Sequence, residues 1–335
     1  MALNTRNYMP PHGIRVPAEV HEAFAAQLLR AAGLGADGAA LVAGILVACD
    51  RRCVFSHGTK RMAEEYLREL QEGGINADPK VKVERQDGAT AVIDGDGGLG
   101  YHACHQGMTM AIDAARQFGV GAVTTYNHHH FGAAGNWTRM AIREGFVGLA
   151  VSSHRFRANP EHVVTSAVGS SPLSIGIPAG EQPPFVLDMG GSSLPSSPEL
   201  MEQFPHVFFK GLGVASISVI LGGVLAGIWR PEIQSTASKW KSNQGSFLSV
   251  WDVSRFMDPA QFAAGMDRHM ADARAMQPFP GMDRAELPGG MEHAWEQENT
   301  KHGIPMTDEH VELLAGWAQR LGVEAPYGAY ENTRF

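Results

Sequence analysis

A long uncharged segment places the strongest constraint on how this chain can fold. Residues 211–229 (GLGVASISVILGGVLAGIW) contain no charged side chain and stand between Lys210 and Arg230. Nineteen residues are enough for a helix to span a bilayer. Five of them are glycine and two are serine, however, and the segment stands alone in an otherwise polar chain. We therefore predict no membrane span but a helix buried in a protein core, where Gly223 and Gly227 allow close backbone approach.

The composition is typical of a cytosolic globular protein. The chain has 335 residues, of which 44% are hydrophobic and 19% charged, and this length predicts two domains. Its 27 basic and 35 acidic residues give a formal net charge of -8, which argues against binding to nucleic acid or to an anionic membrane. Cys49, Cys53 and Cys104 are too few for a disulfide framework, and residues 1–17 contain no apolar secretory segment. We therefore expect a cytoplasmic location.

Hydrophobic periodicity divides the chain into helical ends and a β-rich middle. The first eighty residues show apolar residues at helical spacing, and short β-rich runs begin at Val81. Strands are predicted at 81–84, 90–94, 120–126, 147–153, 173–177, 184–188 and 246–251. Helices are predicted at 101–118, 133–144, 259–276 and 307–321, and residues 277–306 look like a long connection. This order predicts an α/β protein with a separate helical domain.

A glycine-rich loop lies between a predicted strand and a predicted helix. Gly95, Gly97 and Gly100 spell G-x-G-x-x-G, a pattern that can bring backbone amides to a pyrophosphate. A Rossmann site also needs an acidic residue at the end of the next strand, but residues 124–127 (TTYN) contain none. We interpret the loop as a glycine turn, with a dinucleotide site as the alternative.

The most suggestive pair of polar residues is His57 with Arg61. Ser56 is predicted to cap a helix, which places His57 in the first turn and Arg61 on the same face. An arginine can hold a carboxylate bidentately while a histidine exchanges a proton with a neighbouring atom. The alternative is a capped helix start with surface side chains.

Three adjacent histidines, His128 to His130, lie between a predicted strand and a helix, where α/β proteins place ligands. Neighbouring residues of an extended segment point in different directions, so they form no metal site alone. Recruitment of His102, His105, His154 or His162 would be needed, and cysteine or acidic ligands at a recognisable spacing are missing. We predict no metal, and keep a metal-dependent hydrolase or lyase as an alternative function.

Four further residues are candidates for cofactor contact. Asp188 ends the apolar run FVLDM, where it is either a site residue or a turn cap. Lys210 begins the apolar helix and is either a diphosphate ligand or a solvated helix end. Arg155 and Arg157 could meet a phosphate group of a ligand.

Several blocks in one order carry a family resemblance. They are SHG at 56–58 with Arg61 and Tyr66, AVIDGDGGLG at 91–100, NHHHFGAAG at 127–135, EGFVGLA at 144–150, PLSIGIP at 172–178, PPFVLDM at 183–189, KGLG at 210–213 and HGIPM at 302–306. Together they resemble the type-2 malate/L-lactate dehydrogenase family, which groups NAD(P)-dependent reductases of 2-oxo acids and cyclic imino acids. The similarity extends from about residue 14 to residue 323.

The resemblance implies a fold that is mixed α/β but not a Rossmann domain. The nicotinamide cofactor, NAD or NADP, would bind on a mixed, largely antiparallel sheet beside a helical domain built from both chain ends. Accordingly, we assign residues 1–80 with 291–325 to the helical domain and residues 81–290 to cofactor and substrate binding. The resemblance also implies a homodimer. With such a cofactor, Arg155 and Arg157 could meet a 2′-phosphate and thereby favour NADP.

The same resemblance implies a reaction and roles for individual residues. Hydride would pass to the C=O or C=N carbon of a small 2-oxo or 2-imino carboxylate. His57 matches the proton donor and His130 matches a second catalytic histidine. Ser56 and Arg61 are expected to bind the substrate, with Arg61 matching the residue that holds its carboxylate. Cofactor contacts are expected from His154, Val186, Leu187, Asp188, Met189, Lys210, Gly289 and Gly290.

One departure from the family pattern affects these expectations. Only 21 residues separate Asp188 from Lys210, where the family has a longer helical insert that helps to wall the active site. Its loss could widen the substrate pocket, alter the dimer contact or reduce activity. A degenerate member that binds a dinucleotide or a partner without turnover is therefore a third hypothesis.

Overall fold

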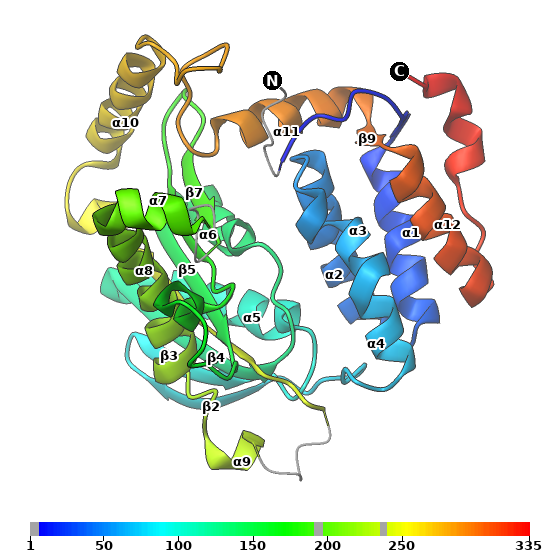
Figure 1. The fold of residues 1–335 in the computed structure, drawn as a ribbon, viewed down its shortest axis with the longest axis horizontal. Coiled ribbons are helices and arrows are strands. Elements are labelled where there is room, and N and C mark those ends of the chain that lie inside the picture. The colour runs from blue at the N-terminus through cyan, green and yellow to red at the C-terminus, as the bar shows by residue number, and fades with distance from the viewer. Residues whose placement is uncertain (1–6, 191–196, 235–239) are drawn as a thin grey trace. The chain divides into compact units, whose positions relative to one another are not determined.

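A computed structural model describes residues 7–190, 197–234 and 240–335. The chain divides into two compact units, Met1–Asp78 with Ala273–Phe335 and Pro79–Asp272, which we name the helical unit and the sheet unit. Both chain ends therefore belong to the helical unit (Figure 1). Residues 273–290, which the sequence analysis assigned to the second domain, lie in the helical unit as well.

The helical unit is closed by pairing between the two ends of the chain. Strand β1 (Ile14–Val16) pairs antiparallel with β9 (Ile304–Met306), and every residue of β9 is buried. The first segment of the unit contains α1 (Ala18–Ala31), α2 (Ala36–Arg51), η1 (Phe55–His57), α3 (Thr59–Arg61), η2 (Met62–Tyr66) and α4 (Leu67–Gln71); the second contains α11 (Gly290–His302), β9, α12 (Asp308–Leu321) and η6 (Tyr327–Thr333). The prediction of a plain connection over 277–306 is wrong, because α11 and β9 lie within it.

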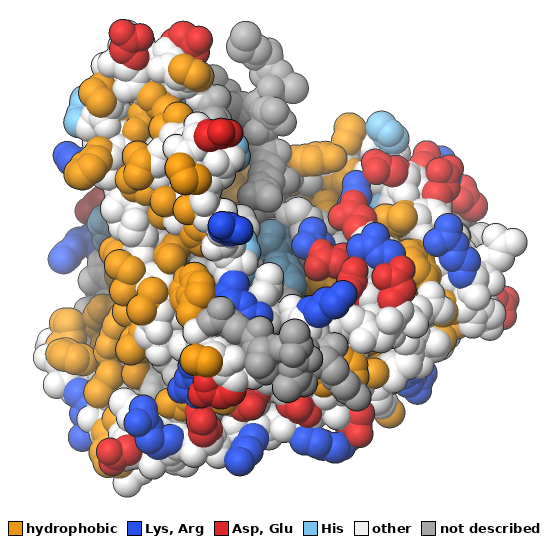
Figure 2. Space-filling model, turned by 60° about the horizontal axis from the view of Figure 1, so that its bottom comes forward, with side chains coloured by type: hydrophobic (Ala, Val, Ile, Leu, Met, Phe, Trp, Pro, Cys, Tyr) orange, Lys and Arg blue, Asp and Glu red, His pale blue; other side chains and the backbone are white. Residues whose placement is uncertain are grey.

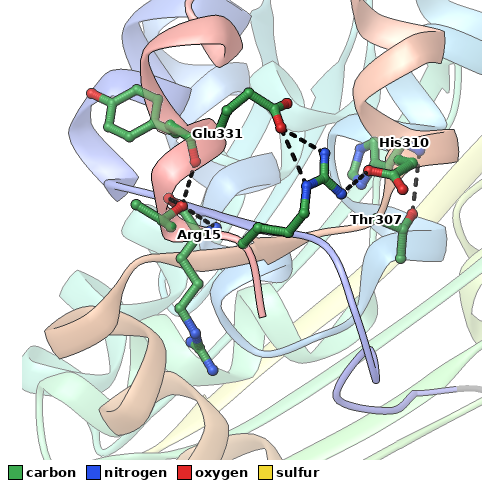
Figure 3. A network of polar contacts seen from close by, with 8 residues as sticks. Arg15, Thr307, His310 and Glu331 are labelled. Atoms are coloured by element: carbon green, nitrogen blue, oxygen red, sulfur yellow. Dashed lines mark hydrogen bonds and ion pairs between the residues drawn. The ribbon is translucent and has the colours of Figure 1, made fainter.

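Polar contacts hold the last residues of the chain against this unit (Figure 3). The Arg334 guanidinium lies between two carboxylates, with Nη1 2.8 Å from Asp308 Oδ1 and Nη2 2.8 Å from Glu331 Oε2. The Thr333 hydroxyl accepts a hydrogen bond from the Arg15 amide and donates one to the Arg15 carbonyl, each at 2.9 Å. Segment η6 is therefore attached to both α12 and β1.

The sheet unit is built on seven strands in the order β2-β3-β4-β8-β5-β6-β7. Among the strands that the structure describes here, β3 and β4 pair in parallel, and every other neighbouring pair is antiparallel. The expected mixed, largely antiparallel sheet is thus confirmed, and a Rossmann domain is excluded. The strands are β2 (Lys82–Asp87), β3 (Thr90–Asp94), β4 (Val120–His128), β5 (Val147–His154), β6 (Leu173–Ile177), β7 (Phe185–Met189) and β8 (Gln244–Trp251), and all seven were predicted.

Two helices pack on this sheet at very short range. Helix α5 (Gly100–Phe118) packs on β4 and β8, and α6 (Ala134–Arg143) packs on β5 and β6. A Cβ atom on Gly121 would lie only 2.0 Å from the Ala111 carbonyl oxygen, so glycine is required where α5 crosses β4. The remaining elements of the unit are η3 (Val164–Val168), α7 (Pro198–Gln203), α8 (Pro205–Val219), η4 (Ile220–Leu225), α9 (Pro231–Gln234), η5 (Val253–Arg255) and α10 (Pro259–Arg274), whose last turn contains the unit boundary.

The apolar segment forms α8 and the π-helical turn η4, which pack on β5. Only 28% of its most apolar window is buried, so the prediction of a buried helix is wrong for a single chain. Close backbone approach does occur, but at Gly222, where a Cβ atom would lie 2.8 Å from the Ser152 backbone. Gly227 has a φ of +78° and lies past the helix end.

The other face of this helix is apolar and exposed. Figure 2 shows a broad cluster of hydrophobic side chains on the surface of the sheet unit, in the left half of the view. In the part of the chain that the structure describes, this is the one helix long and apolar enough to cross a membrane, which by itself is weak evidence. The exposed apolar residues of α8 and η4 include Val207, Phe209, Val214, Ile217, Ile220, Val224 and Leu225.

Candidate active site

The segment that carries Ser56, His57 and Arg61 is a short 3-10 turn followed by a helix. The predicted cap is wrong: α3 begins after Gly58, and the Ser56 hydroxyl lies 3.0 Å from His57 Nδ1 instead. Gly58 has an extended backbone, so His57 precedes the helix that contains Arg61. All three side chains are partly exposed. Ser56 and His57 therefore lie in the 3-10 turn and Arg61 lies in the following helix, so the three residues do not share one continuous helix.

A buried carboxylate fixes the shape of this turn. Asp50 Oδ2 accepts hydrogen bonds from the Thr59 amide at 3.0 Å, from the Thr59 hydroxyl at 2.7 Å and from His21 Nε2 at 3.2 Å. A Cβ atom on Gly58 would lie 1.8 Å from Asp50 Oδ1, so the carboxylate fills the space that any other side chain would need. Asp50 therefore replaces Ser56 as the group that caps the helix.

Two further side chains extend this network into the core of the helical unit. His310 Nε2 lies 3.0 Å from the Thr59 hydroxyl, and the Tyr327 hydroxyl lies 3.2 Å from His21 Nδ1. Burial lowers the pKa of His310 to about 4 and raises the pKa of Tyr327, so both groups are neutral near pH 7. The sequence analysis missed this network, because its members come from separate segments with no common spacing.

Arg61 has a carboxylate neighbour that the sequence analysis did not single out. Its guanidinium Nη2 forms an ion pair with Glu65 Oε2, one helical turn later. The i,i+4 spacing of the two charges was a readable signal for this contact. The turn between them is π-helical, from Met62 to Tyr66, and such turns are frequent at functional sites.

In the sheet unit, several candidate residues lie at the same end of neighbouring strands. His128 ends β4 and His154 ends β5, and both are in register with Gln244 at the start of β8. At the same end of the sheet, Met189 is the last residue of β7 and pairs with Leu173, the first residue of β6. The topology therefore brings the histidine loop, His154 and the end of the FVLDM strand to the same end of the sheet.

The glycine-rich loop supports the histidine loop with its backbone. Gly95 donates its amide to the Tyr126 carbonyl at 2.9 Å, Gly97 to Asn127 at 2.8 Å and Gly100 to His130 at 3.0 Å. These amides are already bonded to protein carbonyls and do not form a cradle for phosphate. The interpretation as a glycine turn is confirmed, and its function is to hold residues 126–130.

The histidines of the loop have different environments. His128 is fully buried, donates from Nδ1 to the His129 carbonyl at 2.7 Å and accepts the Thr125 hydroxyl at Nε2, 2.8 Å away. Burial lowers its pKa to about 4 and keeps the ring neutral. His129 Nε2 bonds to the Trp240 carbonyl at 2.9 Å, and His130 is partly exposed. Two of the three histidines therefore stabilise the loop.

The histidine cluster does not form a recognisable metal site. Within residues 7–190, 197–234 and 240–335, no group of three or more His, Cys, Asp or Glu side chains is arranged to hold a metal ion. Because His128 and His129 use ring nitrogens in hydrogen bonds to the protein, the hydrolase or lyase alternative has no ligand set among these residues.

Asp188 is exposed but has a structural contact. Its Oδ2 accepts the Gly135 amide at 2.8 Å, at the first turn of α6. This contact with α6 was not predicted, and the alternative that Asp188 caps the turn after it involves residues 191–193, which lie outside the described residues. Val186, two residues before it, is buried, and Leu187 and Met189 are partly exposed. Cofactor contact by this strand stays a prediction.

The other cofactor candidates are dispersed. Lys210 is exposed and is the sixth residue of α8, so it does not begin the helix as expected. His154 is partly exposed, and burial lowers its pKa. Gly289 and Gly290 start α11 in the helical unit, where a Cβ atom on Gly290 would lie 2.3 Å from the Glu286 carboxyl group.

Arg155 is occupied by the protein itself. Its Nη1 donates to the Ile228 carbonyl at 2.8 Å and its Nη2 to the Ser242 carbonyl at 2.5 Å. These bonds attach the end of β5 to residues 228–242. These bonds use part of the Arg155 guanidinium, and contact of Arg155 or of the exposed Arg157 with a 2′-phosphate stays a prediction.

Comparison with known proteins identifies the family. A family profile described as malate/L-lactate dehydrogenase matches residues 16–198 and 196–315, and the two matches meet between Asp188 and Lys210, where the chain is predicted to be shortened. Malate dehydrogenase of Pyrococcus horikoshii is 28% identical over 358 residues, covering 95% of this chain and 99% of that protein. A solved structure of malate dehydrogenase from P. horikoshii has a TM-score of 0.82 at 28% identity, covering 95% of this chain and 98% of that one.

Two other similarities extend the comparison. L-sulfolactate dehydrogenase of Methanothermobacter thermautotrophicus is 24% identical, covering 92% of this chain and 98% of that protein. The structure of delta1-piperideine-2-carboxylate reductase from Pseudomonas syringae has a TM-score of 0.69 at 18% identity, covering 91% of this chain and 99% of that one, a similarity of fold alone. With a profile match that extends over most of its length, the chain belongs to the malate/L-lactate dehydrogenase family.

Proposed function

We propose that the protein is an NAD(P)H-dependent oxidoreductase that reduces the C=O or C=N group of a small 2-oxo or 2-imino carboxylate. In the reverse direction it would oxidise the corresponding 2-hydroxy acid. The observation that carries the proposal is a histidine and an arginine held four residues apart on a turn whose shape is set by Asp50 and Gly58. Family membership supports dehydrogenase chemistry at this site.

His57 is the proposed proton donor. When a C=O or C=N carbon accepts a hydride, negative charge develops on the heteroatom, and a positioned imidazolium can protonate it. The hydrogen bond between Ser56 Oγ and Nδ1 restricts rotation of the ring, and in the imidazolium form Nδ1 is the donor. His130, on a loop held by the Gly100 amide, is the second candidate for the same proton or for orienting the same oxygen.

Arg61 is the proposed carboxylate ligand. A planar guanidinium can bind a carboxylate through two parallel hydrogen bonds, which supplies orientation as well as affinity. Orientation matters because hydride transfer needs the electrophilic carbon at a defined distance and angle. The arginine extends from a helix rather than a loop, so its position is well defined.

The residues at this end of the sheet fit a nicotinamide cofactor. A bound dihydronicotinamide supplies the hydride. Strand β7 is last in the described sheet, with β6 as its neighbour on one side only, so its outer backbone groups can pair with an amide such as a carboxamide. We propose that Val186–Met189 and His154 contact the cofactor and that the exposed Lys210 faces its phosphates. Gly289 and Gly290 remain proposed contacts from the helical unit.

We also propose that the protein is a cytoplasmic homodimer. The exposed apolar face of α8 and η4 is larger than scattered surface residues would explain, and contiguous apolar patches mark interaction sites. A second copy of the chain would bury it. Sedimentation velocity should show a dimer, and Ile217→Asp should convert it to monomer. Phe118→Asp, at an exposed phenylalanine outside this face, is the control. A monomeric wild type would contradict the proposal.

The first test is titration of the purified protein with NADH and NADPH, followed by nicotinamide fluorescence and thermal stability. Saturable binding of either would support the proposal and select the cofactor for a screen of 2-oxo and cyclic imino acids. Binding of neither would favour the degenerate alternative, and stoichiometric zinc in the purified protein would favour the metal-dependent one. Arg61→Met should raise the KM for carboxylate substrates, because it removes the charge but keeps an unbranched side chain.

A further inference from the structure

The ion pair between Arg61 and Glu65 bears on which carboxylates the site accepts. Both side chains are about a third exposed, at 36% for Arg61 and 33% for Glu65, so the pair is accessible to a solute. Arg61 Nε is buried and has no hydrogen-bond partner among the described residues. The outer end of the guanidinium, which pairs with Glu65, is therefore the part that a substrate can reach.

The charges next to this pair have partners of their own. Lys60 Nζ lies 3.0 Å from Glu309 Oε1, and Arg68 Nη2 lies 3.1 Å from Glu69 Oε1. Among the residues that the structure describes, Glu65 forms its ion pair with Arg61 and not with Lys60 or Arg68. The negative charge of Glu65 is therefore balanced by the same guanidinium that the substrate carboxylate requires.

A substrate must compete with Glu65 for this guanidinium. When a carboxylate binds Arg61, Glu65 either shares the cation or moves away, but its backbone keeps it one helical turn from Arg61. A monoanion then places two negative charges around one cation, and a dianion places three. Repulsion between like charges a few ångströms apart is substantial even near the protein surface.

We propose that Glu65 is a specificity-determining residue that makes the site favour 2-oxo or 2-imino acids with one negative charge over those with two. The inference rests on the proposed role of Arg61 as carboxylate ligand. It goes further in stating the charge of the substrate, and it distinguishes this chain from a site built for dicarboxylates or sulfonated hydroxy acids.

The test uses two 2-oxo acids that differ by one carboxylate, oxaloacetate and pyruvate. Their dissociation constants for the full-length protein are measured by isothermal titration calorimetry without reduced cofactor, so that no turnover occurs. Glu65→Gln should tighten oxaloacetate about three- to tenfold more than pyruvate, because it removes one repelling charge. Glu64→Gln is the matched control, since the neighbouring Glu64 is exposed and has the same charge.

The outcomes separate the inference from the function on which it rests. If Arg61→Met weakens both ligands but Glu65→Gln leaves their ratio unchanged, the proposed role of Glu65 is wrong and that of Arg61 stands. If Arg61→Met leaves both affinities unchanged, the carboxylate site itself is wrongly assigned. An equal shift of the ratio in Glu64→Gln would reduce the effect to net charge, and absence of binding to Glu65→Gln would also overturn the inference.

Discussion

Replacement of Gly58 by alanine should strongly destabilise the helical unit. The new methyl group would lie 1.8 Å from Oδ1 and 2.6 Å from Cγ of Asp50, a fully buried side chain. Either the turn or the carboxylate must move, and movement of the carboxylate disrupts its bonds to Thr59 and His21. Overpacking contributes about 1–3 kcal/mol and the loss of one charge-assisted hydrogen bond about 1.5–3 kcal/mol. We expect a loss of about 3–5 kcal/mol of unfolding free energy.

Urea unfolding followed by far-ultraviolet circular dichroism would measure this loss. The control is Gly316→Ala, on an exposed helical site of the same unit where a Cβ atom would meet nothing within 4 Å. Alanine is the better helix former, so this variant should gain about 0.5–1 kcal/mol. An unfolding free energy for Gly58→Ala equal to that of the wild type would refute the claim that the buried carboxylate sets the shape of the turn.

Three further predictions concern catalysis, capping and pH. His57→Ala should lower kcat about 10²- to 10⁴-fold in steady-state assays, and if both it and His130→Ala left turnover unchanged, the catalytic assignment would be wrong. Asp188→Asn should lower unfolding free energy in urea by about 1 kcal/mol by weakening the bond to the Gly135 amide, and an unchanged midpoint would contradict that role. Burial lowers the pKa of His102 from 6.5 to about 4, so the unfolded chain takes up a proton that the folded chain excludes, and stability falls as pH drops from about 6.5 to about 4. His102→Leu should make unfolding free energy less dependent on pH between 7 and 5, and an unchanged slope would contradict the burial argument.

Local sequence signals predicted most of the fold. All seven strands of the sheet were found, because each lies in a short segment that contains β-branched or aromatic residues and is separated from the next element by turn residues. Helix α11 was missed, because residues 290–302 lack an apolar stripe and bury little besides Gly290 and Asn299. The order of the strands could not be read, since the position of β8 between β4 and β5 depends on pairing between residues 90 or more positions apart, as for His154 and Gln244.

The apolar helix shows a limit of a different kind. A run of small and apolar residues signals that a surface must be covered, but not whether the covering group belongs to the same chain. Gly222 packs on the sheet as a core residue would, whereas Phe209 is 75% exposed. Sequence periodicity alone could not distinguish the two sides.

The candidate site was predicted only where chemistry is local. His57 and Arg61 were recognised from residue type and spacing, and Glu65 could have been found by the same reasoning. Asp50 and His310 could not, because they meet at Thr59 from distant segments. The residues proposed to perform chemistry were therefore more visible in the sequence than those that hold their turn in place.

The central place of β8 has a consequence for how the chain acquires its structure. Until residues 244–251 have been synthesised and docked, β4 and β5 have no common neighbour, and two partial sheets, β2–β4 and β5–β7, each present an unpaired inner edge. Open strand edges promote association between chains, and pairings distant in sequence form slowly. Refolding yield should therefore fall steeply with protein concentration, and chains truncated before Gln244 should aggregate rather than accumulate as a folded fragment. The last strand of this sheet to be synthesised is therefore the one that joins its two halves and covers both inner edges.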